Sequence, residues 1–278
     1  PRVHFSKTVM AGTPLTLNRK RKRNLLTQEL ADGSVDYAYN SMTSIDLDII
    51  TGKEAIFAHN DIRSLQITQI SVQIEYLDLS YCKLESLPED LQFKLPSLKQ
   101  FYLQGNRLFS MPDLRSLHYL KELNLGDWIG GNQLRALENL PNGLKRLSVC
   151  NNQLEWISLP VGLEYLDASF NLLTFIPINS ALRELRVCGN KISHIPTHFY
   201  HTVASTLILL DVSMNELVER VHEIPGVAVY QENQRIQQTG KRQPDSLFSL
   251  CIEACMREHI KAVPFFYYSC LYSSIVFY

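Results

Sequence analysis

Residues 74–84 read Ile-Glu-Tyr-Leu-Asp-Leu-Ser-Tyr-Cys-Lys-Leu, and the spacing of apolar residues in this stretch decides the fold because it returns along most of the chain. The pattern is L-x-x-L-x-L-x-x-N/C-x-L. Five positions recur together in later copies, and such self-similarity indicates a repeat architecture. The later copies are Leu98, Phe101, Leu103, Asn106 and Leu108; Leu144, Leu147, Val149, Asn152 and Leu154; Leu163, Leu166, Ala168, Asn171 and Leu173; Leu182, Leu185, Val187, Asn190 and Ile192; and Leu207, Leu210, Val212, Asn215 and Leu217.

Within each unit, the spacing predicts a short strand followed by a turn. Alternate side chains of a strand point to opposite faces, so L-x-L buries its leucines and exposes the residue between them. One unit cannot bury its apolar face alone, so the units must stack. The Asn after the strand can both donate to and accept from buried backbone groups, which predicts a structural ladder. Cys82 fills the same slot, and the predicted ladder residues are Asn60, Asn106, Asn152, Asn171, Asn190 and Asn215.

This pattern resembles that of leucine-rich repeat proteins, and its units are short, about 19–26 residues each. Leu140-Pro141-Asn142-Gly143-Leu144 and Leu159-Pro160-Val161-Gly162-Leu163 are similar to the L-P-x-x-L units of bacterial YopM and IpaH effectors. Animal PHLPP-type phosphatases have similar repeats. The resemblance implies an α/β solenoid with a parallel sheet on its concave face. Short units leave little room for helices, so we expect a mostly extended or 3₁₀ convex face.

Composition favours an intracellular protein. Net charge is −1, which argues against a general nucleic-acid or membrane-surface protein. Hydrophobic residues make up 45% of the chain, enough to bury a sizeable elongated core. The six cysteines form no C-x-x-C pair and no cysteine-rich flank, which favours a reducing compartment. No apolar run resembling a signal sequence occurs in the first forty residues. We therefore expect a cytoplasmic location, and also a nuclear one if the basic run 19–23 is an import signal rather than a solvated linker.

Four segments are expected. Residues 1–40 are an extension that lies outside the core or covers its first strand. Residues 41–222 form the repeat domain, and 41–65 are an atypical first unit in which 45–49 alternate like a strand. Residues 223–245 are polar and read as a linker. Residues 246–278 contain a helix and an uncharged aromatic tail, whose role is left open.

The concave face is the predicted binding surface, since tyrosine and arginine on a rigid sheet are typical of protein interfaces. An ordinary solvated sheet face is the alternative. Its carboxylates are expected to be exposed, with nothing to shift their pKa values, so we do not interpret them as a catalytic dyad. The predicted face residues are Tyr76, Asp78, Gln100, Tyr102, Glu122, Asn124, Arg146, Ser148, Tyr165, Asp167, Glu184, Arg186 and Asp211.

One unit carries an insertion at the strand exit, Gly126-Asp127-Trp128-Ile129-Gly130-Gly131. Insertions in repeat proteins map to loops, often on the binding face. Trp128 is therefore either a binding hot spot on a flexible rim loop or a plug that packs back onto the array.

Two short docking motifs lie near the ends of the chain. Arg2-Val3-His4-Phe5 resembles the R-V-x-F motif that binds protein phosphatase 1, with Val3 and Phe5 filling two pockets of that enzyme. Leu247 and Cys251, on a helix that begins near Ser246, resemble the BC-box of elongin-binding ubiquitin-ligase receptors, and 263–271 fit a cullin-2 box. The alternative for the helix is a cap on the last unit.

We expect a non-enzymatic adaptor or scaffold without a cofactor or metal. His194, His198 and His201 lack an acidic or cysteine partner at ligand spacing, so a zinc site is not expected. The partner is expected to be a protein: elongin and cullin, or protein phosphatase 1. The third hypothesis is that the chain is the repeat portion of a larger signalling enzyme or bacterial-type effector. The oligomeric state is left open.

Overall fold

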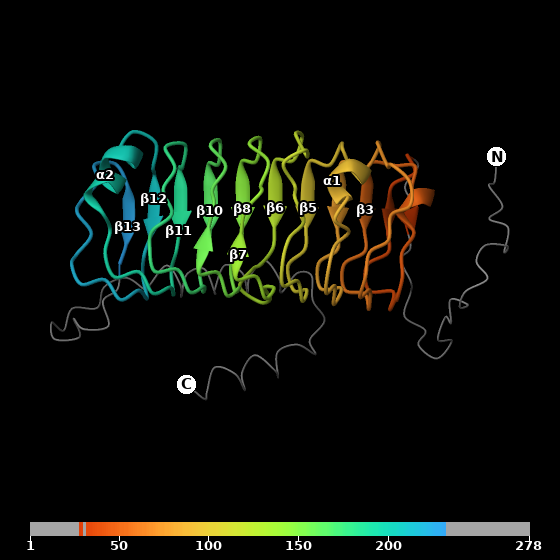
Figure 1. The fold of residues 1–278 in the computed structure, drawn as a ribbon, viewed down its shortest axis with the longest axis horizontal. Helices are drawn as coiled ribbons and strands as arrows, with labels where there is room; N and C mark the ends of the chain where they lie inside the picture. Colours follow the sequence, from red (N-terminus) through yellow and green to blue (C-terminus); the bar gives the residue numbers. More distant parts are fainter. Residues whose placement is uncertain (1–27, 30–31, 232–278) are drawn as a thin grey trace, which may run out of the picture.

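Eleven short strands stand side by side in one sheet and build an elongated solenoid (Figure 1). The computed structural model describes residues 28–29 and 32–231. The strands in sheet order are β1 (Gln28–Glu29), β2 (Val35–Asp36), β3 (Glu54–Ile56), β4 (Tyr76–Asp78), β5 (Gln100–Tyr102), β6 (Glu122–Asn124), β8 (Arg146–Ser148), β10 (Tyr165–Asp167), β11 (Glu184–Arg186), β12 (Leu209–Asp211) and β13 (Ala228–Tyr230).

Neighbouring strands pair in parallel, except that β1 is antiparallel to β2. The register aligns equivalent residues, so Leu77 pairs with Phe101 and Phe101 with Leu123. Backbone hydrogen bonds continue past each strand, since the Leu79 amide donates to the Tyr102 carbonyl at 2.9 Å. Each unit is thereby tied to the next along the whole array.

The middle residue of each main-sheet strand from β3 to β12 points into a continuous apolar core. Phe101 and Leu147 are 0% exposed, and the flanking residues of their strands point away from the core. Burying a leucine-sized side chain contributes about 1.5–3 kcal/mol. The predicted parallel solenoid with one leucine interior is therefore confirmed.

The predicted asparagine ladder is also present. The Asn152 Oδ1 accepts hydrogen bonds from the amides of Asn132 and Leu134, both at 3.2 Å. Its Nδ2 donates to the carbonyl of Val149 at 3.1 Å within its own unit. Cys82 takes the asparagine slot, and its thiol donates to the Phe57 carbonyl at 3.1 Å. These side chains form hydrogen bonds with backbone amides and carbonyls inside the turns, so their role is structural.

The side opposite the main sheet carries only short elements. These are the 3₁₀ helix η1 (Leu47–Ile49), α1 (Leu91–Lys94), α2 (Thr197–Val203) and a two-stranded sheet of β7 (Ala136–Leu137) and β9 (Trp156–Ile157). No helix in the described part of the chain is long and apolar enough to span a bilayer. The strand predicted over 45–49 is wrong: the Asp46 carboxylate accepts from the Asp48 amide at 3.0 Å and starts a helical turn there.

The sheet extends beyond residues 41–222 at both ends. β2 lies within residues 1–40, yet it pairs with β3 and buries Val35. At the other end, β13 lies in the predicted linker and pairs with β12. Backbone pairing extends the sheet wherever the next segment can lie alongside, and it does not require leucine at the L-x-L positions.

A recurring left-handed residue lets the chain leave the sheet. The residue just before an asparagine or cysteine slot has a positive φ in several units, including His59 (57°), Tyr81 (55°) and Gly105 (69°). We call this series of positions the turn row; its further members with positive φ are Asn151, Phe170, Gly189 and Met214. The Tyr81 ring covers Gly105, where an added Cβ would lie 2.3 Å from the ring.

Gly105→Ala is therefore expected to lower the free energy of unfolding by about 1–3 kcal/mol, because it combines left-handed strain with displacement of the Tyr81 ring. Urea denaturation measures this change. Gly226 has φ of 80° and no atom within 4 Å of an added Cβ, so Gly226→Ala reports the backbone strain alone. Equal losses in the two variants would show that the ring contact adds nothing.

Candidate functional site

All thirteen residues predicted for the concave face lie on β4, β5, β6, β8, β10, β11 and β12, at the positions that flank the buried middle residue. We call this side of the sheet the open face. Neighbouring side chains come from strands that are adjacent in the sheet. The register thus brings residues of seven repeat units onto one surface.

The aspartates of this face are less exposed than predicted. Asp167 is 5% exposed and Asp211 is 2% exposed. Each accepts a hydrogen bond from an amide two residues later, Ser169 and Ser213 respectively, at 3.0 Å. Burial raises the pKa of both carboxyl groups, although these hydrogen bonds oppose the shift. The expectation of exposed carboxylates with ordinary pKa values was therefore wrong, because the turn after each strand folds over the side chain.

Asp167→Asn is expected to stabilise the protein at neutral pH. A carboxyl group with a raised pKa in the folded state makes stability fall as the pH rises above its ordinary value of 3.8. Asparagine removes this loss and keeps an oxygen for the Ser169 amide. Denaturation midpoints measured from pH 3 to 8 should show a gain at neutral pH that disappears in acid.

Asp113 serves as a control, because the pKa of its carboxyl group is shifted in the opposite direction. Hydrogen bonds from the Arg115 side chain lower the pKa of its carboxyl group below 3.8. Its stabilising contribution is present above that value and is lost as the pH falls through the lowered pKa. Asp113→Asn should therefore destabilise at neutral pH and have no effect in strong acid. The same pH profile for both variants would contradict this assignment.

Tyr165 lies at the centre of the open face between two arginines. The Arg146 guanidinium is 4.4 Å from the ring centroid and that of Arg186 is 5.2 Å away. Arg186 also forms an ion pair with Glu184 at 3.0 Å. Burial raises the pKa of Tyr165 to about 12, so its phenol stays neutral near pH 7. These contacts hold large side chains in place before any partner arrives.

The insertion loop 126–131 is held in place by hydrogen bonds. The Asp127 carboxylate accepts from the Ile129 and Gly130 amides at 2.9 and 2.8 Å, and from the Tyr81 hydroxyl at 2.9 Å. The Asn151 side chain donates to the Asp127 carbonyl at 2.9 Å. The description of this loop as flexible is therefore replaced by an anchored one.

Trp128 packs back onto the array, which is one of the two alternatives that its sequence position left open. Its ring meets Phe170 edge to face, with centroids 5.1 Å apart. The same side chain also lines a pocket on the open face. The packing contact fixes the indole at the rim, where it is partly exposed.

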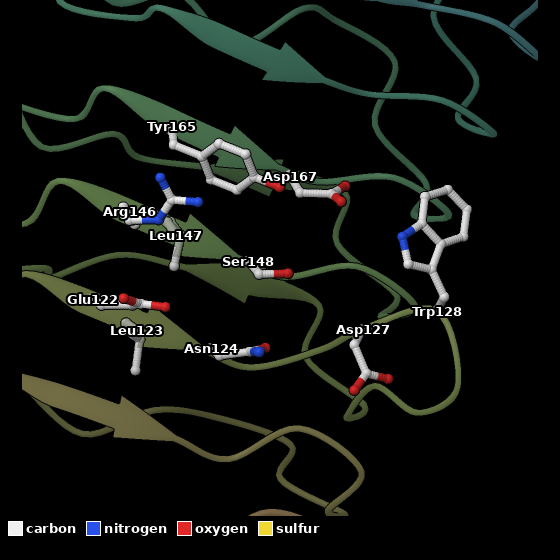
Figure 2. Close-up of a pocket in the computed structure, with 10 residues that line it drawn as sticks. All are labelled: Glu122, Leu123, Asn124, Asp127, Trp128, Arg146, Leu147, Ser148, Tyr165 and Asp167. Carbon is white, nitrogen blue, oxygen red and sulfur yellow. The ribbon is translucent and has the colours of Figure 1, made fainter. Parts of the chain in front are cut away.

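A pocket of about 210 Å³ lies over β6, β8 and β10 (Figure 2). Figure 2 shows Trp128 on one side and Arg146 on the other, with Ser148 and Asp167 between them. The pocket combines aromatic, amide and charged groups in a small space. Its side chains include Glu122, Asn124, Trp128, Arg146, Tyr165 and Asp167.

An aromatic row beside the open face was not predicted from the sequence. Tyr39 stacks on His59 with centroids 4.3 Å apart, and His59 stacks on Tyr81 at 4.6 Å. The interplanar angles are 9° and 6°. All three residues have a positive φ, a property that leaves no signature in residue type. Stacking between these positions runs across three successive units.

Comparisons with known proteins agree with this geometry. The family model for the leucine-rich repeat matches residues 73–93. The leucine-rich repeat domain of APL1B superposes with a TM-score of 0.60 and 21% identity, over 72% of this chain and 64% of that one. At this identity the likeness shows the fold alone.

The chain has the leucine-rich repeat fold. Mouse leucine-rich repeat serine/threonine-protein kinase 1 is 30% identical over 159 residues, which are 54% of this chain and 7% of that protein. Bovine osteomodulin is 28% identical over 188 residues, covering 53% of this chain and 42% of that protein. The chain thus spans less than half the length of either relative.

Several predicted sites lie beyond the described leucine-rich repeat array. Arg2, Val3 and Phe5 precede it, and Leu247 and Cys251 follow it, so the structure does not describe either docking motif. The predicted C-terminal helix lies outside as well. His194, His198 and His201 lie in or just before α2, and no group of three or more potential metal ligands occurs among the described residues.

Proposed function

We propose that the open face binds a protein partner and that the chain works as a non-enzymatic adaptor or scaffold. The main support is the pocket beside Trp128, which an indole lines on one side and a tyrosine ring and an arginine line on the other (Figure 2). Tryptophan, tyrosine and arginine carry most of the binding energy at protein interfaces. Held side chains also lose little conformational freedom on binding.

Photo-crosslinking from defined positions tests this proposal. The full chain would carry a photoreactive phenylalanine analogue at Tyr102 or Tyr165 on the open face, or at Tyr119, which is 61% exposed and precedes β6. Irradiation in cells followed by mass spectrometry identifies the attached proteins. We expect the same protein from both face positions and not from Tyr119. Attachment only from Tyr119 would contradict the proposal.

Finer versions of this function rest on the terminal motifs. In one, the chain is a substrate receptor of a cullin-type ubiquitin ligase that binds elongin through Leu247 and Cys251. In another it is a regulatory subunit of protein phosphatase 1, bound through Arg2, Val3 and Phe5. Purified elongin that binds equally well after Leu247→Ala and Cys251→Ala would exclude the first. Phosphatase binding unchanged by Val3→Ala with Phe5→Ala would exclude the second.

The third version is that the array belongs to a larger signalling enzyme or bacterial-type effector. The similarity to 7% of a mouse kinase supports it, because that protein carries such repeats beside other sequence. The length of the endogenous protein, measured by immunoblotting, tests it. We also retain an intracellular location, cytoplasmic and nuclear, as a proposal from the cysteine pattern. Fluorescence microscopy of the tagged full-length protein tests that location.

A further inference from the structure

The N-terminal end of the open face carries carboxylates without any basic side chain at the face positions, whereas the three carboxylates of the later strands lie beside two arginines. Over β2 to β6 the face positions include four carboxylates and no lysine or arginine. We call this surface the acidic half; its carboxylates are Asp36, Glu54, Asp78 and Glu122. Both arginines of the face, Arg146 and Arg186, lie on the later strands β8 and β11. The whole chain has a net charge of only −1, so the excess of negative charge on this surface is balanced by positive charge elsewhere in the chain.

Nearby lysines do not cancel this charge on the face itself. Lys53 and Lys99 lie just before β3 and β5, at the edge where the strands begin. Both pair with Glu75, at 3.0 and 2.6 Å. Their ammonium groups are thus occupied at the edge, while Glu54 and Glu122 remain on the face.

The negative field of these carboxylates acts on a tyrosine in their midst. Burial raises the pKa of Tyr76 to about 12, and the charges of Asp78, Glu54, Glu122 and Asp36 add to the rise. The effect agrees with the geometry: Asp78 lies on β4 itself, Glu54 on the paired β3, and Asp36 and Glu122 on β2 and β6, two strands away on either side. A cation placed here would meet attraction from several strands at once.

Aromatic rings lie among the same carboxylates. Tyr76 and Tyr102 form a tilted pair with centroids 5.2 Å apart. Beyond the strand ends, the Tyr39, His59 and Tyr81 stack borders the same units. Ring faces attract ammonium and guanidinium groups, most strongly where carboxylates add to the field. The surface thus combines both kinds of group that bind basic side chains.

We infer that the acidic half binds an extended, arginine- or lysine-rich segment of the protein partner. This inference rests on the proposed function, because it specifies the chemistry of that partner. The carboxylates attract the basic side chains, and Tyr76 and Tyr102 present ring faces to them. The pocket beside Trp128 continues this surface toward the later strands, so the rest of the partner extends over β8 and β10.

Peptide binding to the full 278-residue chain tests the inference. The probes are a fluorescent octa-arginine peptide and the matched octa-citrulline peptide, which has nearly the same shape without the charge. Fluorescence anisotropy at low and at physiological salt measures the dissociation constants. We expect the arginine peptide to bind more weakly as salt rises, and the citrulline peptide to bind at least tenfold more weakly at low salt.

Matched charge-removing variants locate the binding surface. Glu54→Gln with Glu122→Gln should weaken arginine-peptide binding about tenfold. The control is Glu138→Gln with Glu155→Gln, which removes the same charge beside β7 and β9 on the opposite side. The control should change binding less than about twofold. Equal weakening in both double variants, or equal binding of the citrulline peptide, would overturn the inference.

Binding of the crosslinked partner to the variants distinguishes a failure of this inference from a failure of the proposed function. If the crosslinked partner needs Trp128 but binds the Glu54→Gln and Glu122→Gln variant normally, the basic-segment inference is wrong and the proposed function stands. If binding depends on neither set of residues, both are wrong. If it is weakened about tenfold by each of the two changes, both are supported.

Discussion

Phe101→Ala is expected to lower the free energy of unfolding by about 3–5 kcal/mol. Phe101 is 0% exposed and forms the middle of β5, where it pairs in register with Leu77 and Leu123. Alanine loses the burial of the ring and leaves a cavity, because strands paired on both sides cannot collapse into it. Chemical denaturation followed by far-ultraviolet circular dichroism measures the loss.

Phe109 supplies the matched control for this change. It is the same residue type in the same unit, but it is 62% exposed. Phe109→Ala should change stability by less than about 0.5 kcal/mol. Similar losses at both positions would mean that the assignment of residues to core and surface in this unit is wrong.

Asn152→Ala is expected to lower the free energy of unfolding by about 2–5 kcal/mol, although it removes no apolar surface. Its side-chain oxygen accepts the amides of Asn132 and Leu134 in the preceding unit. The carbonyls of Leu125 and Val149 keep other donors, from Asn132 and Asn171, but those two amides lose their partner inside the turn. The cost therefore comes from two buried donors left unpaired.

Denaturation of Asn152→Ala beside Asn142→Ala tests the ladder. Asn142 is exposed and lies in the turn before β8, so alanine there should have little effect. Asn152→Asp should also be harmful, because it places a buried carboxylate oxygen against the Val149 carbonyl, which the Asn152 Nδ2 reaches at 3.1 Å. A stability of Asn152→Ala within about 0.5 kcal/mol of the parent would show that the ladder is dispensable.

The core of this fold was predictable because five positions recur together. Leu77, Phe101 and Leu147 were placed by the repeat register, and each is buried in the middle of a strand. The asparagine ladder followed from the same register. A period shared by several positions determines which side chains face inward, even where the residue changes from leucine to phenylalanine.

The ends of the array could not be predicted in the same way. Ala228-Val229-Tyr230 lacks the leucine pattern, yet it continues the sheet through backbone pairing with β12. The alternating residues 45–49 suggested a strand, but the Asp46 side chain accepts an amide two residues later and begins a 3₁₀ turn. Local capping and backbone pairing decide both segments, and neither appears in a hydrophobic pattern.

The candidate site was predicted in position but not in chemistry. The register placed Tyr165, Asp167 and Arg186 on one surface, but not the burial that raises the pKa of Asp167. The position of Trp128 depends on Tyr81, because the Tyr81 hydroxyl donates a hydrogen bond to Asp127 in the same loop, 46 residues further along the chain. Contacts across several units place these groups, and a pattern within one unit cannot report them.

A matched pair of tryptophans tests the central claim that the open face is the binding surface. Trp128 lines its pocket, whereas Trp156 lies on β9 of the opposite sheet and is 41% exposed. The measurement is the dissociation constant of the crosslinked partner for Trp128→Ala and for Trp156→Ala. We expect about tenfold weaker binding for Trp128→Ala and less than a twofold change for Trp156→Ala. Weaker binding of Trp156→Ala alone, or an equal loss in both, would contradict the claim.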